Sequence, residues 1–237
     1  MPFDTPTVLV FGAAAKVLVA ATMLSIWLRH RRAVWLVWWA CTYLFATLAG
    51  LVFFAYGLGG ELRAIGAGVA LIVTAFACCW QGARTFEGRR PLWLVLVGAP
   101  AIWLAFCLLP GFLDDLRLRV LVSSLLLAWL PAMAAVELWR GHRETLLSRA
   151  PAVALFGTLA LVFASRIAFI DALPFPFGAL PLQEPWVAAF HVILFVHAVG
   201  LTILLLTMTN ERFALDRGRR RVEATVFRHG PADPQGL

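Results

Sequence analysis

The segment WQGARTFEGRRPLW, residues 80–93, lies between two long apolar runs and gathers Gln81, Glu87 and three arginines within a few positions. A charged island of this kind is an active-site loop, a phosphate-binding loop or a connector at the surface of a membrane. The composition of the chain on both sides of the island decides between these readings.

The chain is far more apolar than a soluble protein. Of its 237 residues, 62% are hydrophobic and 14% are charged, and the mean hydropathy is +0.85. An average soluble domain is about 45–50% apolar and about 25% charged. These values exclude a water-soluble globule and favour a protein that lies within a bilayer.

Seven apolar runs account for most of the sequence. A bilayer core about 30 Å thick requires about 20 apolar residues per helix, and barrel strands would instead alternate with a period of two. We therefore predict an all-α, polytopic membrane protein with a bundle of seven transmembrane helices. The predicted spans are 7–28, 33–56, 62–81, 91–109, 118–139, 150–170 and 186–208.

The basic residues are concentrated in alternate connectors. Four connectors hold three, three, three and six arginines, whereas the other three connectors hold three arginines together. Because cytoplasmic loops carry the excess of Lys and Arg, the pattern predicts an outside N-terminus and a cytoplasmic C-terminus. The net charge of +7 is thus a topology signal, and we expect no nucleic-acid partner.

The island at residues 80–93 is accordingly predicted to be a cytoplasmic turn. Each basic residue near an anionic leaflet contributes about 1 kcal/mol to the attraction between the protein and that leaflet. We therefore expect anionic lipids as partners. The predicted lipid-facing basic cluster comprises Arg84, Arg89, Arg90, Arg219, Arg220 and Arg221.

Four residues at membrane depth are the candidate ligand-binding residues: Lys16, Arg166, His191 and His197. Ionisable residues in a membrane are costly and mark functional sites by default. Structural readings stand beside this one: Lys16 hydrogen-bonds within the bundle, and Arg166 extends to the outer interface. His191 and His197 lie about 120° apart around a helix, so they cannot share a metal, and we expect no metal or cofactor.

The sequence carries none of the common catalytic motifs. G-x-S-x-G, P-loop and H-E-x-x-H patterns are missing, so we expect a protein that is not an enzyme. Glu137 has Arg140 three positions later, which predicts a local ion pair. The turn at Asp114 and Asp115 is expected to cap the following helix.

Two segments resemble the seven-helix membrane input domain of bacterial diguanylate cyclases: GARTFEGRRP, residues 82–91, and MTNER, residues 208–212. In that family a G-x-R-x-F-x-G-R-P turn follows the third helix, and here Arg90 is inserted before Pro91. The resemblance implies a sensory module in the bacterial inner membrane. The family's cyclase domain, marked by Gly-Gly-Asp/Glu-Glu-Phe, has no counterpart in this sequence, so we expect an input module without its own catalytic domain.

Two functions therefore remain open. The first is a sensory or regulatory membrane module, with a seven-helix domain at residues 1–208 and a basic cytoplasmic tail at residues 209–237. We expect this module to bind a small-molecule ligand and to form a homodimer through its seventh helix and tail. The second is a small-solute transporter with a three plus one plus three helix arrangement. The W-x-x-H-R pattern at 27–31, repeated at 139–143, is the basis for the second reading.

Overall fold

The structure, a computed structural model, describes residues 5–57, 63–141, 145–170 and 185–228. These residues form seven α-helices and contain no β-strand, so the all-α prediction is confirmed. Each predicted span matches one helix to within a few residues, except that the third and seventh helices continue well beyond their apolar runs. The helices are α1 (Thr5–Arg29), α2 (Trp35–Gly57), α3 (Arg63–Phe86), α4 (Trp93–Cys107), α5 (Leu116–Arg140), α6 (Arg149–Ala168) and α7 (Pro185–Arg228).

Six of these helices are long and apolar enough to cross a membrane, and α4 is the shorter one. Its 15 residues extend over about 22 Å at 1.5 Å per residue, whereas the hydrocarbon core measures about 30 Å. Pro91 precedes the helix and Pro110 follows it closely. Because the residue before a proline is disfavoured in the helical region, Pro110 disfavours a helical Leu109, and α4 ends at Cys107, short of the predicted span 91–109.

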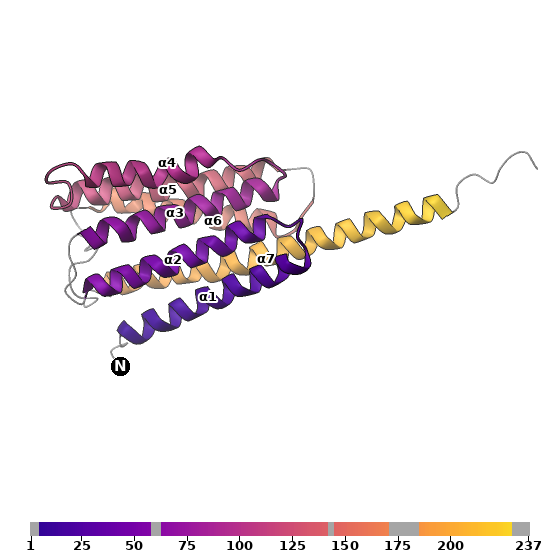
Figure 1. The fold of residues 1–237 in the computed structure, drawn as a ribbon, viewed down its shortest axis with the longest axis horizontal. Coiled ribbons are helices and arrows are strands. Elements are labelled where there is room, and N and C mark those ends of the chain that lie inside the picture. The colour runs from indigo at the N-terminus through magenta and orange to yellow at the C-terminus, as the bar shows by residue number, and fades with distance from the viewer. Residues whose placement is uncertain (1–4, 58–62, 142–144, 171–184, 229–237) are drawn as a thin grey trace, which may run out of the picture.

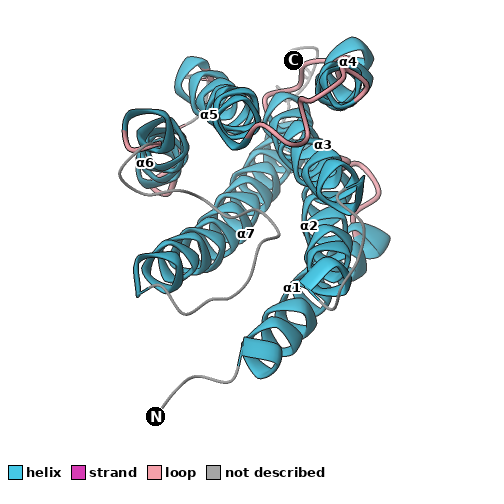
Figure 2. Ribbon diagram, turned by 90° about the vertical axis from the view of Figure 1, so that its left-hand side faces the viewer, coloured by secondary structure: helices cyan, strands magenta, loops and turns pink. Residues whose placement is uncertain are grey.

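The six long helices follow one another around the bundle. Each of α1, α2, α3, α5, α6 and α7 packs against the next in this order, and α7 returns to α1, with α4 packed on the outside against α3 and α5 (Figures 1 and 2). Trp103 fixes α4 by donating its indole N–H to the Gly66 carbonyl of α3 at 2.8 Å. Across the bundle, the Tyr43 hydroxyl of α2 lies 2.5 Å from the Thr202 hydroxyl of α7.

Helix α7 has 44 residues and leaves the bundle at the end where α3 and α5 terminate (Figure 1). Residues 214–221 are exposed, whereas Leu205, Met208 and Thr209 are buried against the other helices. The first part of the predicted basic tail, residues 209–228, is thus helical and belongs to α7. Asp115 also has its predicted role, because its side chain caps α5 by accepting from the Leu118 N–H at 3.0 Å.

Candidate functional site

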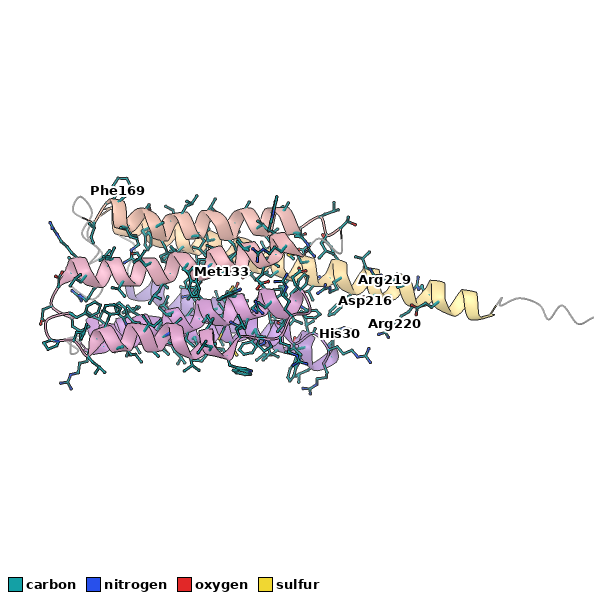
Figure 3. The ribbon with its side chains drawn as sticks, turned by 90° about the horizontal axis from the view of Figure 1, so that it is seen from above. His30, Met133, Phe169, Asp216, Arg219 and Arg220 are labelled. Atoms are coloured by element: carbon teal, nitrogen blue, oxygen red, sulfur yellow. The ribbon has the colours of Figure 1, made fainter. Side chains whose placement is uncertain are left out.

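A cluster of charged side chains gathers where α3 and α5 end, α6 begins and α7 leaves the bundle. We call it the polar junction and define it as Arg84, Glu87, Arg89, Glu137, Arg149 and Arg212. Figure 3 places His30, Asp216 and Arg219 near this end of the bundle and Phe169 at the opposite end. The island at residues 80–93 supplies three of the six members.

Glu137 of α5 lies at the centre of the polar junction. Its carboxylate pairs with the guanidinium of Arg84 and, at 2.8 Å, with that of Arg89. Only 5% of the Glu137 side chain is exposed. A carboxylate buried to this degree requires charged partners, so the end of α3 and the turn after it are held against α5.

A second ion pair joins the same turn to α6. Arg149, the first residue of α6, lies 3.0 Å from the Glu87 carboxylate and also donates to the Leu138 carbonyl at 3.2 Å. Gly141 makes room for this pair, since a Cβ there would lie 1.8 Å from Glu87 Oε2. Glycine at 141 therefore allows α5 and α6 to share one charge pair with the turn after α3.

The turn itself has a defined backbone. Gly88 has φ +74°, a left-handed conformation that L side chains rarely adopt. The Gln81 side-chain oxygen accepts a hydrogen bond from the Leu92 N–H at 2.7 Å, and the Arg84 Nε donates to the Arg90 carbonyl at 3.2 Å. These bonds close the segment between α3 and α4 into a compact loop.

Aromatic rings extend the polar junction to α2 and α7. The Phe86 ring contacts Trp35 at a centroid distance of 5.4 Å and Trp39 at 5.7 Å. The guanidinium of Arg212 lies 4.2 Å from the Phe86 ring centroid, and Arg212 also donates to the Phe86 carbonyl. Trp39 packs so closely on Gly82 that a Cβ there would lie 2.2 Å from its indole nitrogen.

Two further bonds fix the same part of α7. The Thr209 hydroxyl accepts from the Trp35 indole N–H at 3.2 Å. The Glu211 carboxylate accepts from the Ser148 hydroxyl at 2.9 Å. Residues 209–212 therefore contact α2, α3 and the residue before α6, so that α7 is held on three sides where it leaves the bundle.

The two segments that carry the family resemblance, 82–91 and 208–212, are thus in direct contact through Arg212 and Phe86. The sequence did not predict this contact. It also paired Glu137 with Arg140, which is wrong, because Glu137 pairs with Arg84 and Arg89 instead. Helix spacing identifies partners on the same helix only, and the partners of Glu137 come from α3 and the following turn.

The members of the predicted lipid-facing basic cluster have different surroundings. Arg84 is largely enclosed, with 15% of its side chain exposed, and Arg89 is 43% exposed while still paired with Glu137. Arg90 and the three arginines at 219–221 are exposed. Arg84 and Arg89 therefore belong to the polar junction, and the other four members of the predicted cluster lie at the surface.

The candidate ligand-binding residues lie apart from the polar junction. Lys16 is half-buried on α1, and the His197 ring of α7 lies 3.1 Å from the Thr158 hydroxyl and 2.8 Å from the Ile193 carbonyl. The side chain of His191 lies outside the described residues. Arg166 is 2% exposed, with its guanidinium 5.8 Å from the Phe190 ring centroid, so neighbouring side chains enclose it near the end of α6.

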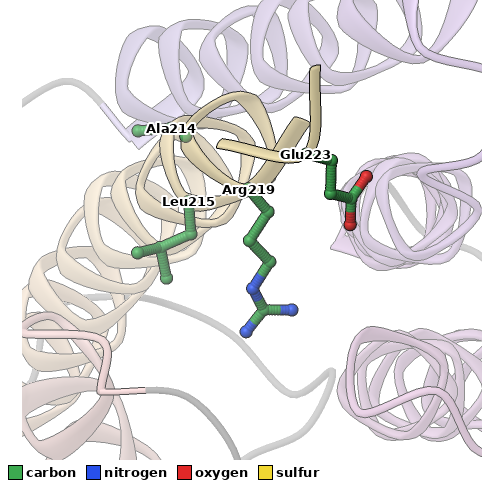
Figure 4. Close-up of a pocket in the computed structure, with 5 residues that line it drawn as sticks. Ala214, Leu215, Arg219 and Glu223 are labelled. Carbon is green, nitrogen blue, oxygen red and sulfur yellow. The ribbon is translucent and has the colours of Figure 1, made fainter. Parts of the chain in front are cut away.

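Neither a group of metal-ligating side chains nor an enclosed pocket supports the candidate ligand-binding residues in the described part of the chain. Within the described ranges, no three His, Cys, Asp or Glu side chains are grouped so that they could hold a metal ion. A surface hollow on α7 is lined by Leu215, Arg219 and Glu223 with two small residues, all from this helix (Figure 4). A hollow lined by one helix does not enclose a ligand.

The described residues thus form an all-helical protein, and six of their helices are long and apolar enough to cross a membrane. Comparison of the chain with protein-family models, with curated proteins and with solved structures finds no match. The functional conclusion consequently depends on the geometry of this chain.

Proposed function

We propose that the chain is a sensory or regulatory module of the bacterial inner membrane, with its N-terminus outside and its C-terminus in the cytoplasm. In this proposal a small ligand or a change in the membrane biases the helix bundle, and α7 transmits the change to the cytoplasm. The observation that carries the proposal is the place where α7 leaves the bundle: one continuous helix is held there by α2, α3 and the residue before α6, and its residues 214–221 are exposed.

The contacts at the exit explain how α7 responds to the bundle. Trp35 moves with α2, Phe86 with α3 and Ser148 with α6, and each contacts a different residue within 209–212. A relative shift of any two of these helices therefore changes the position of α7. A ligand shifts such an equilibrium only if it binds the two arrangements with different affinity.

The ligand site belongs to the same proposal. Lys16, Arg166 and His197 come from α1, α6 and α7, helices that pack in sequence around the bundle. A ligand that contacts residues from these helices changes how they pack, and α7 carries that change through the exit. The resemblance to diguanylate cyclase input domains supports this role, as well as a homodimer formed through α7 and the tail.

An output fusion tests the proposal. A diguanylate cyclase domain joined after Arg228 is expressed behind the full chain, behind α7 alone, and behind the full chain carrying Arg212→Lys. We expect cyclic dinucleotide production to differ between the full chain and α7 alone, and Arg212→Lys to abolish this difference. Equal activity in all three fusions refutes the sensory role.

A small-solute transporter is the second candidate. Helices α1–α3 and α5–α7 follow one another in the same order around the bundle while α4 lies outside, an arrangement that suits two three-helix repeats joined by a linking helix. Substrate-dependent flux in proteoliposomes, unaffected by Arg212→Lys, would favour this function.

A further inference from the structure

A groove opens at the polar junction and shares Glu87, Arg149 and Arg212 with it. It lies between the α1–α2 turn, the end of α3, the start of α6 and α7. Its volume is about 620 Å³. Its charged lining consists of Arg32, Glu87, Arg149, Arg212, Asp216 and Arg219. Four guanidinium groups face two carboxylates, so the charged lining is positive by two charges.

One arginine of the groove, Arg149, has donors that no carboxylate of the groove uses. Arg149 is 8% exposed and uses Nη1 for Glu87 and Leu138, whereas its Nε and Nη2 are buried and have no hydrogen-bond partner among the described residues. A buried charged group with unused donors costs free energy. An anion at this place supplies the missing negative charge.

The type of donor indicates the type of anion. All four cations are arginines, whose planar guanidinium groups match the oxygens of phosphate in a bidentate manner. Trp35, which is partly exposed, adds an apolar wall to the same groove, and Phe86 is fully buried beside it. The groove therefore suits a phosphate group attached to an organic portion better than a bare inorganic ion.

We propose that this groove binds the phosphate of an anionic ligand, either the head group of an anionic phospholipid or a soluble phosphoanion. The site lies at the end of the bundle where α1 ends and α2 begins (Figure 1), and helix ends carrying clustered arginines lie at the level of lipid head groups. The binding is independent of the proposed sensory output, since it requires only the folded groove.

The experiment uses the full chain in a neutral detergent at fixed ionic strength. Native mass spectrometry measures binding of phosphatidylglycerol, phosphatidylcholine and sodium pyrophosphate. The groove variants are Arg32→Ala and Arg219→Ala, and the matched controls are Arg29→Ala and Arg220→Ala, which remove the same charge from exposed positions that do not line the groove. Asp216→Asn removes an acid from the groove.

We expect phosphatidylglycerol or pyrophosphate to bind and phosphatidylcholine to bind weakly. Each groove variant is expected to weaken binding about five- to tenfold, the loss of one guanidinium contact, while Asp216→Asn strengthens it and the controls leave it unchanged. Binding of phosphatidylglycerol alone identifies a lipid site, and binding of pyrophosphate identifies a soluble ligand. Equal losses in groove variants and controls, or no binding of either anion, overturn the inference.

Discussion

The guanidinium of Arg212 on α7 lies 4.2 Å from the centroid of the Phe86 ring on α3, and the same group donates to the Phe86 carbonyl. The last carbonyls of a helix have no partner within their own helix. Arg212 donates to the Phe86 carbonyl from another helix and adds a cation–π contact with the Phe86 ring. The end of α3 and the exit of α7 are therefore one structural unit.

Arg212→Lys is expected to loosen α7 where it leaves the bundle. A lysine keeps the charge but loses both the planar stacking on Phe86 and the fixed donor geometry. Amide hydrogen exchange of residues 209–221 is expected to become at least about tenfold faster, because a hydrogen bond to a charged group contributes about 1.5–3 kcal/mol. Arg220→Lys, at an exposed position of the same helix, serves as the control, and equal exchange in both variants contradicts the role of Arg212.

Glu137→Gln is expected to destabilise the protein by about 3 kcal/mol. The substitution keeps the size of the side chain but leaves Arg84 and Arg89 without their shared carboxylate, and breaking a buried pair costs about 3–5 kcal/mol. The exposure of Arg89 places the expected value at the lower end of this range. Chemical unfolding in detergent measures the effect.

Glu223→Gln is the matched control for Glu137→Gln, because Glu223 is exposed on α7. Its free energy of unfolding should remain within about 0.5 kcal/mol of the parent protein. A loss of the same size in the two variants would mean that Glu137 is not a structural centre.

Gly82→Ala is expected to disturb the packing of α3 on α2. A Cβ at 82 would lie 2.2 Å from the Trp39 indole nitrogen, and Trp39 itself is fully buried. Overpacking of this kind costs about 1–3 kcal/mol. A Cβ at Gly157 of α6 meets nothing within 4 Å, so Gly157→Ala should be neutral or stabilising by up to about 1 kcal/mol. Thermal unfolding is expected to show a loss of stability for Gly82→Ala and none for Gly157→Ala.

The apolar runs predicted the helices well because the thickness of the bilayer core sets the minimum length of a membrane helix. They missed the end of α3, which continues from Gln81 to Phe86. Polarity marks the end of an apolar run, whereas hydrogen bonding determines the end of a helix. Gln81 is fully buried and Arg84 is largely enclosed because Leu92 and Glu137 bind them.

The polar junction was only partly visible in the sequence. The charged island and the segment 208–212 were both singled out, but the contact between Arg212 and Phe86 joins positions 126 residues apart. Two signals were available: Glu137 is an acid within an apolar run, and Gly82 and Gly141 stand where close approaches occur. Neither signal identifies which residue Glu137 or the glycines contact, because these contacts depend on how the helices pack.

Cysteine labelling across α4 tests the predicted topology. The native residues Cys41, Cys78, Cys79 and Cys107 are first replaced by alanine, and Arg90→Cys or Asp114→Cys is then introduced at exposed positions on either side of α4. If α4 crosses the bilayer with the N-terminus outside, a membrane-impermeant maleimide labels the Asp114 variant in intact cells and the Arg90 variant only after permeabilisation. Because α4 has 15 residues, this is the span for which the result is most informative. Labelling of both positions from one side shows that α4 does not cross, and reversed labelling shows that the arginine-rich connectors face the exterior.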